Sequence, residues 1–339
     1  MRRLPGPKAG LWRLGHHAAR ANGFTLLEIL VAVSLLSFIV LGLFAMFNQT
    51  QRAFRSSMTQ SDILEAGRAV AQMIPRDLEQ MTAGYRGGLK NFTFEVLGGV
   101  QPLTQNLPGA IAPNKLVRTN FLEDVFLLLR DNQTWVGIGY CVRLADTNGV
   151  LWLPEASPGQ LGAGTLYRYT ATLPFLYPSG AMRGLPQDPG VLYTAFRQAC
   201  VSGSAASTNI NNRICDGVVH FQFRTFATNG FPIFSDTTRT NGLFATNGLA
   251  NGWVPVQQTR AFFSAVCPDN VLALDFYSNA LPAVVEMELG LLEQYSYERY
   301  ASIGSPAARL AYLQREETST RVHLFRERVP IRNVDPSAY

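Results

Sequence analysis

The chain has 339 residues, of which 47% are hydrophobic and 16% are charged. This composition is sufficient for a substantial core in one or two domains and excludes a disordered protein. The formal net charge of +5 lies in residues 1–23, which hold five basic residues and no acid. Beyond them basic and acidic residues balance at 24 each. Because no Lys/Arg cluster follows, we expect no nucleic-acid partner.

The first element along the chain is an apolar segment at residues 24–47, FTLLEILVAVSLLSFIVLGLFAMF, with one charge, Glu28, and no proline. As a helix it spans roughly 36 Å, enough for a bilayer core of about 30 Å. The basic residues before it predict a cytoplasmic N-terminus. It is too long for a secretory signal, and no A-x-A-like site follows it. A plain anchor leaves Glu28 unexplained, because a carboxylate at the membrane centre costs roughly 2.5–3.5 kcal/mol.

The residues around this acid carry a resemblance. Gly23-Phe24-Thr25-Leu26-Leu27-Glu28 resembles the processing motif of type IV prepilins and type II secretion pseudopilins. The resemblance implies that a prepilin peptidase cuts between Gly23 and Phe24 and then methylates the new amine of Phe24. It also implies that Glu28 pairs with a neighbouring subunit's amine and sets the register of assembly. A simpler interpretation of Glu28 is a favourable interaction with the helix dipole.

The helix is expected to continue over residues 48–84. Apolar residues recur at helical spacing from Phe47 to Met81, and we expect the lower half of this stripe to pack on a sheet. Gly84 is the expected stop. Gly67 lowers helix propensity, and Pro75 is expected to kink or interrupt the helix.

From residue 85 the sequence pattern predicts strands. Eight segments are rich in β-branched and aromatic residues: Asn91–Leu97, Glu123–Arg130, Trp135–Leu144, Thr165–Leu173, Gly217–Phe226, Val271–Tyr277, Ala283–Leu292 and Arg321–Arg328. Asn-Gly pairs at 148–149, 229–230, 241–242, 247–248 and 251–252 predict tight turns. Residues 227–254 are expected to form an exposed insertion, and Pro306–Glu317 a short helix.

The expected organisation has four parts. These are a cleaved leader at 1–23, a transmembrane helix at 24–47, an amphipathic continuation at 48–84 and a β-rich periplasmic domain at 85–339. The expected fold is α+β, with one long N-terminal helix packed on a C-terminal antiparallel sheet, as the resemblance to pilins also implies.

Three segments further along the chain narrow the resemblance to one kind of subunit. Ala69–Gln80, Asp216–Phe226 with Asn229-Gly230, and Leu281–Leu289 look like the J-type minor pseudopilin of type II secretion. That resemblance implies a non-enzymatic, single-pass inner-membrane protein that joins the tip of the pseudopilus and supports protein export. The implied partners are the prepilin peptidase, other minor and major pseudopilins, and the inner-membrane assembly platform. The alternative is a W-type minor pilin of a type IV pilus, used in adhesion, twitching or DNA uptake.

Four cysteines, Cys141, Cys200, Cys215 and Cys267, all follow the apolar segment. An oxidising periplasm favours disulfides among them, with three connectivities open. Cys200 and Cys215 flank a 14-residue Ser/Asn-rich loop and are the preferred pair. Free buried thiols are the other interpretation, particularly for Cys141. The spacing does not match a zinc site.

No catalytic constellation or cofactor motif is found, so no cofactor or metal is expected. His220 and His323 lie in predicted strands among aromatic residues and are interpreted as structural. Asp269, Asn270 and Asp275 are too sparse to predict calcium binding. A membrane-anchored periplasmic enzyme or ligand-binding protein remains the alternative from another class.

Overall fold

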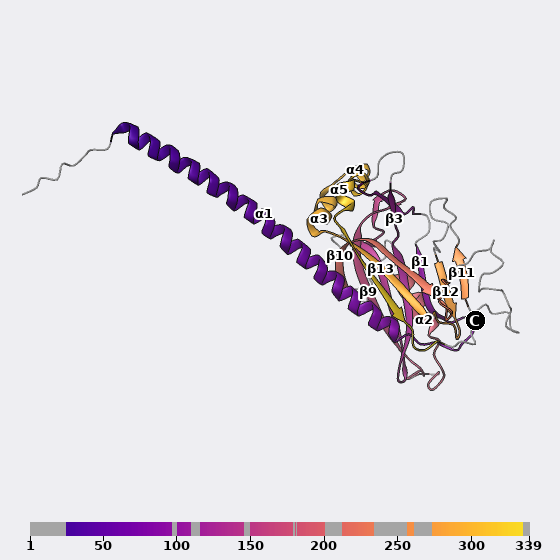
Figure 1. The fold of residues 1–339 in the computed structure, drawn as a ribbon. Helices are drawn as coiled ribbons and strands as arrows, with labels where there is room; N and C mark the ends of the chain where they lie inside the picture. Colours follow the sequence, from indigo (N-terminus) through magenta and orange to yellow (C-terminus); the bar gives the residue numbers. More distant parts are fainter. Residues whose placement is uncertain are drawn as a thin grey trace, which may run out of the picture. The chain divides into compact units, whose positions relative to one another are not determined.

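The computed structural model describes residues 25–334, without 97–99, 110–115, 146–149, 179, 181, 201–211, 234–255 and 261–272, and without the side chains of 55, 56, 256–260 and 273. Contacts divide the chain into two units, Met1–Ser56 and Ser57–Tyr339. Helix α1 (Leu26–Glu79) begins in the first unit and ends in the second. The second unit also holds all the described strands (Figure 1).

The fold is α+β, as predicted, with one long helix followed by an antiparallel sheet domain. The strands are β1 (Lys90–Val96), β2 (Leu103–Asn106), β3 (Val117–Asn120), β4 (Glu123–Asp131), β5 (Thr134–Ala145), β6 (Leu151–Trp152), β7 (Glu155–Ser157), β8 (Gln160–Leu161), β9 (Gly164–Pro174), β10 (Asn212–Phe226), β11 (Val256–Arg260), β12 (Ala273–Tyr277), β13 (Val284–Leu292) and β14 (Val322–Pro330). The shorter helices are α2 (Gly190–Cys200), α3 (Gln294–Ser302), α4 (Pro306–Leu313) and α5 (Glu316–Ser319).

The main sheet has the strand order β11-β12-β1-β4-β5-β9-β10-β13-β14, with β6 beside β5. Every neighbouring pair in it is antiparallel. A two-residue turn joins β4 to β5, where Asn132 adopts a positive φ of 51°, which Asn tolerates better than most residues. The pairs β2-β3 and β7-β8 form separate small sheets.

All eight predicted strands are present in the described chain, and the largest difference is in β10, which begins at Asn212 rather than Gly217. The predicted helix over 306–317 divides into α4 and α5. Helix α2 was not predicted, although two signals for it are present. Asp188-Pro189 is a typical helix start, and the apolar residues Leu192 and Phe196 are spaced to lie on one face of a helix. The Asn229-Gly230 turn is present, with Gly230 at φ 81°. The other Asn-Gly pairs and most of the predicted insertion lie outside the described residues.

The structure differs from the expected stop at Gly84 and shows no interruption at Pro75. The helix passes through Pro75 without interruption and ends at Glu79, five residues before Gly84. It ends early because the backbone turns to join the sheet: the Thr82 N–H donates to the Leu128 carbonyl at 3.1 Å, and Met81 forms a bridge with Leu129. Gly67 has a packing role in α1. A Cβ at this position would lie 2.1 Å from Cζ of Phe325 in β14, so glycine leaves room for the ring.

The two faces of the sheet bury different cores. On one face, the lower part of α1 contributes Ile63, Val70, Ile74 and Leu78 to the larger cluster. On the other face, α2 contributes Leu192 and Phe196 to a smaller cluster. Strand β4 supplies both in alternation, with Val125, Leu127 and Leu129 in the larger cluster and Phe126 and Leu128 in the smaller.

The lower half of the predicted stripe on α1 therefore packs on the sheet, whereas Phe47, Phe54, Met58 and Leu64 are exposed. A polar anchor reinforces the packing. Asp77 of α1 accepts hydrogen bonds from the Tyr140 hydroxyl at 2.5 Å and from Nε of Arg168 at 2.9 Å. Burial and the neighbouring Asp77 carboxylate raise the pKa of Tyr140, so its hydroxyl stays a hydrogen-bond donor.

Candidate functional site

The predicted cleavage residues Gly23 and Phe24 lie outside the described residues, which begin at Thr25. Thr25 and Glu28 together form a capping box at the start of α1. Oε2 of Glu28 accepts from the backbone N–H of Thr25 at 3.1 Å and from its hydroxyl at 3.2 Å, and Oγ1 of Thr25 accepts from the N–H of Glu28 at 3.3 Å. The T-x-x-E spacing is a known sequence signal for this arrangement, but Glu28 was interpreted from the sequence through subunit pairing and the helix dipole, and the capping box was missed.

The capping box explains why α1 begins where it does, and the explanation does not involve residues 1–23. Thr25 satisfies a free donor of the first helical turn, and Glu28 places negative charge at the positive end of the helix dipole. The Glu28 side chain is exposed, so its carboxylate is accessible for a cationic partner. A cut after Gly23 would leave a single residue, Phe24, before the helix cap.

The segment that follows is uniformly apolar. Leu26–Phe47 contains no charge other than Glu28, and α1 is the one helix in the described part of the chain that is long and apolar enough to cross a membrane. Its hydroxyls are satisfied within the helix: Ser34 donates to the Val31 carbonyl and Ser37 to the Val33 carbonyl, both at 2.8 Å. Such bonds are needed where no water can solvate a hydroxyl.

The pairing of Cys200 with Cys215 stays a prediction. Cys141, Cys200 and Cys215 are buried and unlinked in the structure. Cys200 belongs to the small cluster under α2, whereas Cys215 belongs to the large cluster on the opposite face of the sheet. The sheet therefore separates these two residues, although one short loop joins them in sequence. Cys267 lies outside the described residues.

Of the two histidines, His220 is buried between strands. Its Nδ1 accepts from the N–H of Phe121 at 3.1 Å, and its Nε2 lies 3.5 Å from Oε2 of Glu288. The hydrogen bond from His220, followed by the charges of Arg224 and Arg326, lowers the pKa of Glu288 to about 2 against the opposing effect of burial. This group links β10, β13 and β14.

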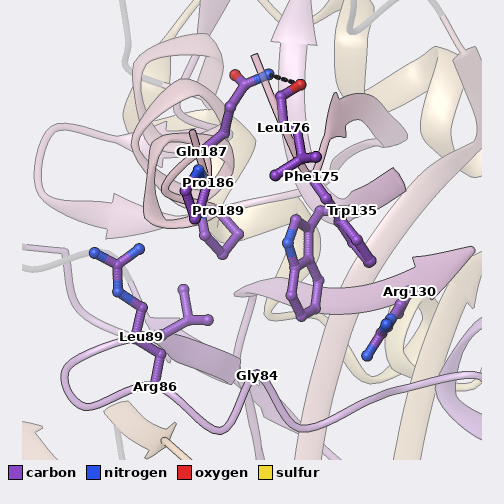
Figure 2. A pocket seen from close by; sticks show the side chains of 10 residues that line it. All are labelled: Gly84, Arg86, Leu89, Arg130, Trp135, Phe175, Leu176, Pro186, Gln187 and Pro189. Carbon is purple, nitrogen blue, oxygen red and sulfur yellow. Dashed lines mark hydrogen bonds between the residues drawn. The ribbon is translucent and has the colours of Figure 1, made fainter. Parts of the chain in front are cut away.

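A surface pocket of about 300 Å³ lies near the C-terminal end of α1, between the loop before β1, the β4–β5 hairpin and the segment before α2 (Figure 2). The rings of Trp135 and Phe175 form one wall, with centroids 5.0 Å apart, and the Arg130 guanidinium lies 4.6 Å from the Phe175 centroid. Across the pocket, Arg86 lies 3.4 Å from Asp188.

The residues that line the pocket are suited to binding an apolar or anionic group rather than to catalysing a reaction. Its ten residues are Gly84, Arg86, Leu89, Arg130, Trp135, Phe175, Leu176, Pro186, Gln187 and Pro189. None of these can act as a nucleophile or a general base near neutral pH. Sequence reasoning did not identify the pocket, because its walls come from three separate segments.

No cluster of three or more His, Cys, Asp or Glu residues with metal-binding geometry occurs in the described parts of the chain. Asp275 is part of the sheet instead: it accepts from Thr93 at 2.5 Å and from Tyr277 at 3.1 Å, and Lys90 lies 3.1 Å away. Asp269 and Asn270 lie outside the described residues.

Comparison with known proteins yields one match. Residues 18–44 match the family described as the prokaryotic N-terminal methylation motif. No curated protein and no solved structure matches the chain. The match includes Gly23, Phe24 and the capping box, and it ends inside the apolar part of α1. It supports a type IV pilin-like or pseudopilin relationship, and the motif implies prepilin peptidase processing and anchoring by a single apolar helix.

Proposed function

We propose that this protein is a minor pseudopilin of a type II secretion system, processed by prepilin peptidase and assembled at the pseudopilus tip to support protein export. The observation that carries the proposal is the methylation motif at residues 18–44, with a capping carboxylate at the head of an uninterrupted apolar helix. The helix anchors the chain in the inner membrane, and the sheet domain lies in the periplasm. The protein has no enzymatic role in this proposal.

The charge of Glu28 supports an assembly role beyond helix capping. Glutamine could also complete a capping box, yet the chain has a carboxylate, which is costly in an apolar segment. Cleavage after Gly23 would create an α-amino group with a pKa near 7.7–8.0. In a low-dielectric environment, attraction to such an amine on a neighbouring subunit offsets the desolvation of the carboxylate.

The choice of the secretion machinery rests on the downstream similarity to J-type subunits at residues 69–80, 216–230 and 281–289. Partners would be other minor and major pseudopilins and the inner-membrane assembly platform. A W-type minor pilin shares the same membrane chemistry in a different machine, so phenotype must distinguish the two.

The first test deletes the gene and follows secreted hydrolases between periplasm and medium. We expect periplasmic retention, restored to export by the wild-type chain but not by Gly23→Val, which blocks cleavage. The intact mass of the wild-type chain should correspond to a start at Phe24 with one added methyl group.

Normal hydrolase export with loss of surface pili or twitching would assign the protein to a type IV pilus. A wild-type chain that retains residues 1–23 in cells with active prepilin peptidase would contradict both pilin-like roles and favour an anchored enzyme or ligand-binding protein.

The second test separates the charge of Glu28 from its capping bond. Glu28→Gln retains an acceptor for the Thr25 N–H but removes the charge, whereas Thr25→Ala keeps the charge and removes the capping hydroxyl. We expect Thr25→Ala to co-purify with the other pseudopilins and Glu28→Gln, like Glu28→Val, to lose this association, while all three are still cleaved. Wild-type association of Glu28→Gln would refute the role of the charge.

A further inference from the structure

Helix α2 is held on the sheet by its last residue. Nε of Arg143 in β5 donates to the carbonyl of Cys200 at 2.9 Å, and the same guanidinium donates to both carboxylate oxygens of Asp124, at 2.8 Å to one of them. Arg143 and Asp124 are 1% and 3% exposed. A buried, multiply bonded arginine fixes the position of the backbone it contacts, so the end of α2 is well defined against β5.

This arrangement brings two thiols together. Cys141 lies two residues before Arg143 in β5, and its side chain shares a hydrogen bond with that of Cys200. The two cysteines are 0% and 2% exposed and belong to the same small cluster. Cys215, the third described cysteine, lies in the cluster on the opposite face.

We propose that Cys141 and Cys200 form a disulfide that ties α2 to β5. This proposal rests on the proposed function, which places both residues in the periplasm, where disulfides form and persist. It replaces the Cys200–Cys215 pairing predicted from the loop between those residues, and it differs from the role of Glu28 because it concerns the sheet domain alone.

The chemistry needs a disulfide donor from outside the chain, of the class of oxidised glutathione or a periplasmic dithiol oxidase. One cysteine thiolate attacks a donor sulfur, forms a mixed disulfide and releases one donor thiolate. The second cysteine thiolate attacks the protein sulfur of that mixed disulfide and releases the other donor thiolate. Two protein thiols are oxidised, one donor disulfide is reduced to two thiols, and the two protons from the cysteines pass to those thiols.

The reaction belongs to folding rather than to the finished protein. Burial, reinforced by the hydrogen bond that the Cys200 thiol donates to Cys141, raises the pKa of the Cys200 thiol well above its ordinary value. A buried, protonated thiol is a poor nucleophile. The donor therefore reacts before α2 has docked, and docking then protects the bond from reductants.

The test in cells uses the full chain, taken from membranes denatured with N-ethylmaleimide present and no reductant. After digestion we expect a peptide linking Cys141 to Cys200, and this peptide should persist in Cys215→Ala and disappear in Cys141→Ala. A chain that starts at Phe24 but carries maleimide on both Cys141 and Cys200 overturns the disulfide and leaves the proposed function intact.

A second arm does not depend on export. The detergent-solubilised full chain is denatured, reduced and refolded in a buffer of oxidised and reduced glutathione, and recovery of the fold is followed by circular dichroism. We expect Cys141–Cys200 to be the major linked pair in the refolded wild-type chain. Refolded chains with both thiols free, or with Cys200 linked to Cys215, overturn the proposal even if the first arm fails because the chain is not exported.

Discussion

At the scale of single residues, Glu28 and Glu288 show two different uses of a carboxylate. Glu28 is exposed, and its bonds are to its own helix cap. Glu288 is mostly buried, and it joins His220, Arg224 and Arg326 across three strands. The first carboxylate is available for a partner outside the chain, whereas the second is committed to the sheet.

Glu288 gives a prediction about acid stability. Its pKa is lowered from 4.5 to about 2 in the folded chain, so its stabilising contribution is complete above about pH 4.5 and is lost as the pH falls towards 2. Thermal unfolding of the detergent-solubilised chain should show a Glu288→Gln variant with a lower Tm than wild type at pH 6, by a few degrees. The difference should shrink progressively between pH 4.5 and 2.

The control is Glu286→Gln, which removes a neighbouring carboxylate that lies 3.7 Å from Arg224. At pH 6 its Tm should fall less than that of Glu288→Gln, because Glu286 lies 3.7 Å from Arg224 and 3.9 Å from Arg326, whereas Glu288 is hydrogen-bonded to Arg326. An equal fall in Tm for the two variants would show that Glu288 has no special role.

At the scale of elements, α1 shows how packing overrides propensity. Glycine costs a helix about 1 kcal/mol relative to alanine, and proline normally interrupts it. Gly67 is retained where the ring of Phe325 occupies the space of a Cβ. Pro75 lies between Ile74 and Leu78, which are both fully buried against the sheet domain, so packing holds the turn that proline disfavours.

Gly67→Ala is therefore expected to destabilise the sheet domain although alanine is the better helix former. Overpacking costs about 1–3 kcal/mol, which exceeds or equals the propensity gain of about 1 kcal/mol, and the expected net loss is up to about 2 kcal/mol. Gly42→Ala is the matched control on the same helix, because nothing lies within 4 Å of a Cβ there. Thermal unfolding should show a lower Tm for Gly67→Ala than for wild type, and no such decrease for Gly42→Ala. In a Phe325→Ala background, the chains with glycine and with alanine at position 67 should have the same Tm. A decrease that persists in the Phe325→Ala background would exclude the ring contact as its cause.

At the scale of the whole molecule, local sequence patterns predicted the helices and strands. They did not predict which of these elements contact one another. The β-branched and aromatic residues of Gly217–Phe226 and the apolar segment at residues 24–47 are properties of neighbouring residues, so the strand and the helix could be predicted. The order of the sheet places β1 beside β12 and β5 beside β9, which no local pattern specifies.

The same limit explains the candidate site. The cleavage motif and Glu28 form a contiguous sequence and could be predicted. Which cysteines face each other depends on the face of the sheet that each occupies, and the bulges between Arg213 and Val218 in β10 change that face locally. The short loop between Cys200 and Cys215 carries no information about these faces.

The contact of Gly67 with Phe325 also has a consequence during synthesis. The two residues are separated by about 260 positions, and a ribosome adding roughly 5–20 residues per second needs tens of seconds to make that length. Throughout that interval the apolar side of α1 exists without its last partner. The packing of Phe325 on Gly67 can therefore form only after all the other described strands of the main sheet have been made.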